Sequence, residues 1–68
     1  MTKIKSECER LAEEAKVLQQ TVRNLELLAR QAGQAEAAEV LDAACTEIHE
    51  AKQSLIHAGI VVGKEMAI

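Results

Sequence analysis

The chain has no aromatic residue and no proline, and its 68 residues include only three glycines and two cysteines. Without proline, nothing in the sequence forces a helix to stop or kink, and the abundant alanine, leucine, glutamate and glutamine are all compatible with helix. Without aromatic rings, the protein lacks the side chains that usually stack on the bases of single-stranded nucleic acids. The apolar residues that are present are numerous and periodic, which argues against a disordered chain.

These apolar residues fall into two stripes in which steps of four and three alternate. The first consists of Ile4, Cys8, Leu11, Ala15, Leu18, Val22, Leu25, Ala29 and Ala32, and the second of Ala37, Leu41, Ala44, Ile48, Ala51, Leu55, Ala58 and Val62. This heptad spacing predicts two helices, at about residues 4–32 and 36–65, each packed along another helix.

Gly33 suits the left-handed position that ends a helix, so a turn is expected at residues 32–35. A short connection makes the helices antiparallel neighbours, and the single domain, residues 1–68, is therefore predicted to be an all-α, heptad-packed two-helix hairpin. Folding the chain at this turn pairs Leu18 with Ala51 and Leu25 with Ala44. Large residues set against small ones would fill the space between the helices.

Cys8 and Cys45 lie about 25 Å apart along the axis of such a hairpin, too far for an intramolecular disulfide. Two reduced, mostly buried thiols fit a cytoplasmic protein. Charged residues follow Met1 instead of an apolar run, so we expect no signal peptide. The apolar stretch from Ala58 to Val62 is too short to span a membrane, and no membrane partner is expected.

A chain this short buries a thin core, and self-association is the expected remedy. Apolar residues outside the stripes suggest a second buried surface: Val17, Leu27, Ile56, Ile60 and Val61. We therefore predict a homo-oligomeric helical bundle, a dimer or larger. Gly59 and Gly63 indicate either a frayed helix end or the close approach of another surface, and the apolar register favours a helix that continues to about Glu65.

No arrangement of residues indicates an enzyme or a bound cofactor. Cys45 and His49 have a spacing that metal ligands use, but no third ligand is evident, so we interpret them as a buried thiol beside a surface imidazole and predict no metal. A Cys–His nucleophile would lack an orienting third group. Phosphate loops and dinucleotide fingerprints are absent from the sequence.

The net charge of −3 excludes the electrostatic footprint of a protein that binds duplex nucleic acid. One face beside the predicted interface is nevertheless basic, and it could receive a small anion or an acidic partner. Its candidate ligand-binding residues are Lys16, Arg23, His49, Lys52, Gly59 and Gly63, with the glycines giving access to the backbone. The same pattern also fits a solvated helix face on which Arg30 and Asp42 balance each other.

The run Ala44-x-Thr46-x-Ile48-x-Glu50-Ala51 resembles the second helix of small phage-encoded hairpin proteins that sequester cyclic nucleotides and so counter CBASS-type signalling. The resemblance implies an oligomer of antiparallel hairpins that holds a cyclic nucleotide between protomers without cleaving it, in the host cytosol. That family usually has aromatic residues just after the motif, where this chain has Lys52-Gln-Ser-Leu55. Arg23 could stack on a base in their place.

Three functions follow as hypotheses. The first is a non-enzymatic sponge for a small anionic nucleotide signal. The second is a small antagonist or adaptor that binds a host regulatory protein through one helical face. The third is a purely structural oligomer. Stacking aromatic residues would have favoured the first hypothesis, and their absence favours the second.

Overall fold

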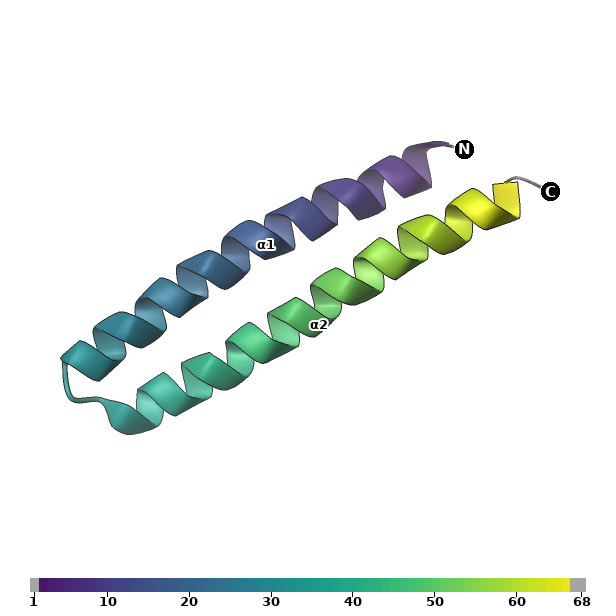
Figure 1. The fold of residues 1–68 in the computed structure, drawn as a ribbon. Helices are drawn as coiled ribbons and strands as arrows, with labels where there is room; N and C mark the ends of the chain where they lie inside the picture. Colours follow the sequence, from purple (N-terminus) through teal and green to yellow (C-terminus); the bar gives the residue numbers. More distant parts are fainter. Residues whose placement is uncertain (1, 67–68) are drawn as a thin grey trace.

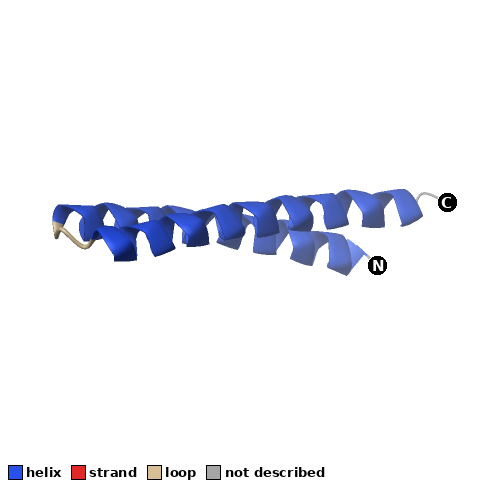
Figure 2. Cartoon of the chain, turned by 90° about the horizontal axis from the view of Figure 1, so that it is seen from below, coloured by secondary structure: helices blue, strands red, loops and turns tan. Residues whose placement is uncertain are grey.

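Two long helices running side by side in opposite directions make up the fold (Figure 1). The computed structural model describes the backbone of residues 2–66 and the side chains of residues 3–65. Helix α1 comprises Thr2–Gln31 and helix α2 comprises Ala35–Met66, one or two residues from the ranges expected from the sequence. The predicted all-α hairpin is confirmed, and it forms a rod of 54 × 14 × 9 Å that is a single layer thick (Figure 2).

The turn between the helices is closed by a Schellman motif around Gly33. Gly33 has a φ of 76°, the left-handed conformation that glycine adopts without strain. The amide of Gln34 donates to the carbonyl of Ala29 at 2.8 Å, and the amide of Gly33 donates to the carbonyl of Arg30 at 3.1 Å. The carbonyl of Gln34 then accepts the first bond of α2, from the amide of Ala38. One residue thus ends α1 and the next begins α2.

Helix α2 continues through both of its glycines to Met66, so the glycines do not mark a frayed end. Gly59 is buried, and a Cβ atom placed on it would lie 3.6 Å from Cβ of Cys8 on α1. A Cβ atom on Gly63 would lie 3.9 Å from Nζ of Lys5. The surface that approaches Gly59 closely is therefore the other helix of the same hairpin.

Small residues form the closest contact between the helices. Ala12, Ala29, Ala38 and Cys45 are buried, and Cys45 is the largest side chain that is fully buried among the described residues. We call the line along which the helices touch the seam. It consists of Cys8, Ala12, Ala15, Gln19, Val22, Glu26 and Ala29 on α1 and of Ala38, Leu41, Cys45, Ile48, Lys52, Leu55, Gly59 and Val62 on α2, all of them buried or half-buried.

The seam differs from the predicted stripes, and this corrects the predicted layers. On α1 only every second stripe residue lies in the seam, while Ile4, Leu18 and Leu25 remain 61%, 53% and 49% exposed. Ala51, the expected partner of Leu18, is also exposed. In a heptad pattern, neighbouring rows such as those of Leu18 and Gln19 are about 100° apart around the axis, so the contact has turned toward the smaller side chains. Helix axes approach most closely where side chains are small.

Candidate functional site

The rows flanking the seam on one side of the hairpin are polar. Lys16, Arg23 and Arg30 follow one another at seven-residue intervals on α1, and Asp42 and His49 do so on α2. Nη1 of Arg23 donates to Oδ1 of Asp42 at 3.0 Å, which shows that the two rows lie on the same side. We call these five residues the polar side.

The arginines of the polar side are held by carboxylates. Glu26, in the seam, is only 5% exposed, and its Oε2 accepts hydrogen bonds from Nε and Nη2 of Arg30 at 3.1 and 2.8 Å. Its other oxygen accepts from Nη1 of Arg23. Hydrogen bonds to Asp42 and then to Glu26 raise the pKa of Arg23 above its ordinary value. Both guanidinium groups are thereby fixed in place, and much of their charge is balanced.

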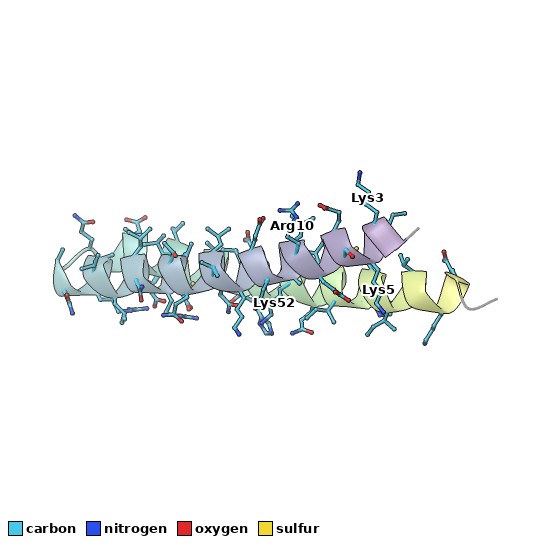
Figure 3. All side chains as sticks on the ribbon, turned by 90° about the horizontal axis from the view of Figure 1, so that it is seen from above. Lys3, Lys5, Arg10 and Lys52 are labelled. Atoms are coloured by element: carbon cyan, nitrogen blue, oxygen red, sulfur yellow. The ribbon has the colours of Figure 1, made fainter. Side chains whose placement is uncertain are left out.

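Three lysines add further cations beside the paired arginines. Within residues 3–65, no ion pair involves Lys5, Lys16 or Lys52. Lys52 starts in the seam and is half-buried, whereas Lys16 is exposed. Lys5 and Lys52 extend from the same side of the rod, and Lys3 and Arg10 from the opposite side (Figure 3).

Lys5 is a cation of this site that the sequence-based prediction missed. Its Nζ lies near Gly63, which occupies the same seven-residue row of α2 as Asp42 and His49. The long aliphatic part of Lys5 thus carries the charge from the seam out to the polar side. A signal was present in the sequence, because Lys5 stands seven residues before Ala12, which lies in the seam.

The six predicted ligand residues do not all lie together. Lys16, Arg23 and His49 share the polar side, and Lys52 extends from the seam. Gly63 lies at the edge of the polar side near Lys5, at the end far from the turn. Gly59 is buried against Cys8, so a ligand could reach its backbone only if the helices separated. A ligand role for Gly59 stays a prediction, whereas the described geometry gives it a packing role.

Cys45 and His49 are four residues apart but face different surroundings. The thiol of Cys45 is fully buried and donates to the carbonyl of Gln19 at 3.8 Å, whereas His49 is exposed. The interpretation as a buried thiol beside a surface imidazole is confirmed for these positions. Across the described residues, no cluster of three or more His, Cys, Asp or Glu side chains has the geometry to hold a metal ion.

On the opposite side of the hairpin, the rows that flank the seam are apolar. Near the turn this side has an open hollow of about 350 Å³, lined by Leu25, Leu28, Ala29, Ala32, Gln34, Ala37 and Leu41. The hollow contains no charged side chain, and it joins the leucine row of α1 to the alanine row of α2. The rows that flank the seam are therefore charged on one side of the rod and apolar on the other, from which Lys3 and Arg10 also extend.

Comparison of the chain with models of protein families, with curated proteins and with solved structures finds no match. Neither helix, over the part of the chain that the structure describes, is both long and apolar enough to cross a membrane.

Proposed function

We propose that this protein is a non-enzymatic, homo-oligomeric binding protein whose polar side holds a small anionic ligand of the cyclic-nucleotide class. The observation that carries the proposal is that Lys16, Arg23 and Lys52 lie on one side of a chain with a net charge of −3, with Lys5 farther along the same side near Gly63. In this proposal the ligand is held without being cleaved, as in the phage sponges that the motif around Thr46 resembles. The protein would act in the cytoplasm, which is the host cytosol if a phage encodes it.

The ion pairs define how a phosphate would bind. Arg23 is held in position by Glu26 and Asp42, so its guanidinium loses little freedom when a ligand arrives. A phosphate would replace the exposed Asp42 as a partner of Arg23, while the buried Glu26 stays in place. Lys16 and Lys52, which have no ion-pair partner in residues 3–65, would supply the charge that makes the exchange favourable. His49 would add a further donor.

A second candidate function is that of a protein antagonist or adaptor, which would use a helical face to bind a host regulatory protein. What favours it is the balance of charge at Arg23 and Arg30 together with the apolar side chains on the outer surface. Val17 is 65% exposed, and Leu27 and Ile60 are each 51% exposed. An amphipathic target could anchor on such residues.

Calorimetric titration with a panel of cyclic di- and trinucleotides tests the ligand. We expect one of them to bind more tightly than about 100 μM, which corresponds to about −5.5 kcal/mol. Lys16→Glu should weaken binding by about 10- to 100-fold, since a hydrogen bond to a charged group contributes about 1.5–3 kcal/mol. Lys3→Glu makes the same charge change on the opposite side of the rod and should leave the affinity unchanged.

The bound nucleotide should be recovered intact after the protein is denatured, because the proposal assigns no residue to activate water. Cleavage that depends on the protein would contradict the non-enzymatic part of the proposal. If no nucleotide binds more tightly than about 100 μM while a lysate protein is retained on immobilised hairpin, the antagonist function replaces the sponge.

A further inference from the structure

The apolar side of the hairpin extends from one end of the rod to the other and is made from two rows. We call it the Leu/Ala face: Ile4, Leu11, Leu18, Leu25 and Ala32 on α1, with Ala37, Ala44, Ala51 and Ala58 on α2. Its α1 leucines are 38–53% exposed. The named residues of these two rows are all apolar, and at the end far from the turn the alanine row of α2 continues to the exposed Glu65. On the polar side, by contrast, the α1 row carries Lys16, Arg23 and Arg30, and the α2 row carries Asp42 and His49 before Ile56 and Gly63.

We propose that a second copy of this chain covers the Leu/Ala face, with the leucine row of each hairpin packed on the alanine row of its partner. The inference rests on the oligomeric part of the proposed function and is independent of any ligand. In this proposal the oligomer forms through the Leu/Ala face and not through the outer residues predicted from the sequence, such as Val17 and Leu27. The product is a four-helix bundle of two hairpins whose turns lie at the same end.

Over residues 3–65, a single hairpin encloses few apolar side chains, and none of the large ones is fully buried. The largest fully buried side chain of the described residues is that of Cys45, and every leucine of α1 is exposed. A chain of this size rarely folds on such a core, and natural proteins of this length add a disulfide, a metal or a partner. Both cysteines are free, and residues 3–65 form no metal cluster. A partner is the remaining means of stabilisation.

The leucine row of α1 and the alanine row of α2 also fit each other across a dimer. In a dimer whose two-fold axis runs along the rod, α1 of one copy lies over α2 of the other, so every leucine meets an alanine row. Turning the partner end over end instead would set leucines on leucines and alanines on alanines, which leaves the two halves of the interface unequally filled. Leu28 and Val40, 60% and 66% exposed at opposite edges near the turn, would also meet across the first arrangement.

The area of the Leu/Ala face also fits a dimer interface. Helices of 30 and 32 residues are about 45 Å long at ~1.5 Å per residue, and two axes about 8–10 Å apart present a face about 18 Å wide. The Leu/Ala face therefore covers about 800 Å², which is the area that each partner contributes to a stable interface of ordinary size. The bundle leaves both polar sides exposed to solvent, where the proposed ligand would bind.

Sedimentation without nucleotide tests the assembly separately from ligand binding. Chains of 7.4 kDa should sediment as a dimer at low micromolar concentration. A monomer at that concentration would overturn the inference, whatever the nucleotide titrations give. A stable dimer with no nucleotide affinity would instead leave the inference intact and refute the sponge.

A matched pair of leucines tests which face assembles. Leu18, in the Leu/Ala face, and Leu27, outside it, are 53% and 51% exposed. Leu18→Glu should raise the dimer dissociation constant by about 100-fold or more, because it places an unpaired carboxylate in the interface of each copy. Leu27→Glu should leave it unchanged. Equal effects of the two substitutions would show that the interface lies elsewhere.

Spin labels at the turn keep the arrangement testable even if Leu18→Glu prevents folding. The label would be attached to Gln34→Cys in a chain that also carries Cys8→Ala and Cys45→Ala. Turns at the same end place the two labels within about 30 Å, given neighbouring helices about 10 Å apart. A distance near the 54 Å length of the rod would overturn the proposed packing.

Discussion

At the scale of single residues, Glu26 is the one buried charged side chain in the part of the protein that the structure describes. It lies in the seam with 5% exposure, and it accepts hydrogen bonds from Arg23 and Arg30, which are on the same helix and half exposed. A carboxylate is costly to bury unless its charge is matched, and here two guanidinium groups match it. The same pairs hold the arginines along the polar side, so one residue serves both packing and the candidate site.

Glu26→Gln removes this charge while keeping the size of the side chain. We expect the free energy of unfolding to fall by about 1–2 kcal/mol, less than for a fully buried pair because both arginines can still reach water. Glu14→Gln is the control, since Glu14 pairs with Arg10 on the surface and should contribute no more than about 0.5 kcal/mol. Urea unfolding at one fixed protein concentration measures both. A loss for Glu26→Gln as small as that for Glu14→Gln would contradict the role assigned to Glu26.

At the scale of the elements, the turn depends on the conformation of one residue. Gly33 has positive φ, and nothing lies within 4 Å of where its Cβ would be. Any effect of a substitution there therefore comes from the backbone and not from a clash. The Schellman bonds from Gly33 and Gln34 to the end of α1 require that left-handed conformation.

Gly33→Ala should therefore lower the free energy of unfolding by about 1–2 kcal/mol, which is the cost of the left-handed conformation for a residue with a Cβ atom. Gly33→Asn should cost less, because asparagine tolerates this conformation better. Thermal and urea unfolding at matched concentration would rank the three proteins. If alanine and asparagine cost the same, strain at this φ is not what the glycine relieves.

In the whole molecule, the seam is flanked by charged rows on one side and by the apolar rows of the Leu/Ala face on the other, and most of the large aliphatic side chains are exposed. A core made chiefly of alanine, glycine and cysteine contributes little apolar burial at about 25 cal/mol per Å². Folding and assembly are therefore expected to occur together, with the Leu/Ala face supplying the second half of the core.

The melting temperature should consequently rise with protein concentration, because mass action favours the assembled state. A concentration series from low to high micromolar, followed by circular dichroism at 222 nm, measures this. The Leu18→Glu chain should melt lower and show no such dependence. A melting temperature of the unmodified protein that is constant across the series would mean that the hairpin folds as a monomer.

The helices and the turn could be predicted from the sequence alone. The signals are local: alternating steps of three and four, the absence of proline and the single glycine between the stripes. Local backbone geometry is enough to relate each of them to a helix or to its end. The burial of Cys45 and the polar rows, with Lys16 and Arg23 on α1 and His49 on α2, were also accessible to sequence reasoning, because residues seven apart on one helix share a side.

The rotation of each helix about its own axis, in contrast, depends on how the two helices pack together. The heptad pattern favours large apolar residues, so it predicted that Leu18 and Ala51 would be buried between the two helices. Both residues are exposed instead. On each helix the predicted stripe and the seam share one row of residues, which on α1 is the row of Ala15 and Val22. Which of the two faces the other helix depends on how closely the two helix axes can approach each other, and this depends on the side chains of both helices together. Small residues at Ala12, Cys45 and Gly59 permit the closer contact, and this turns the leucines outward.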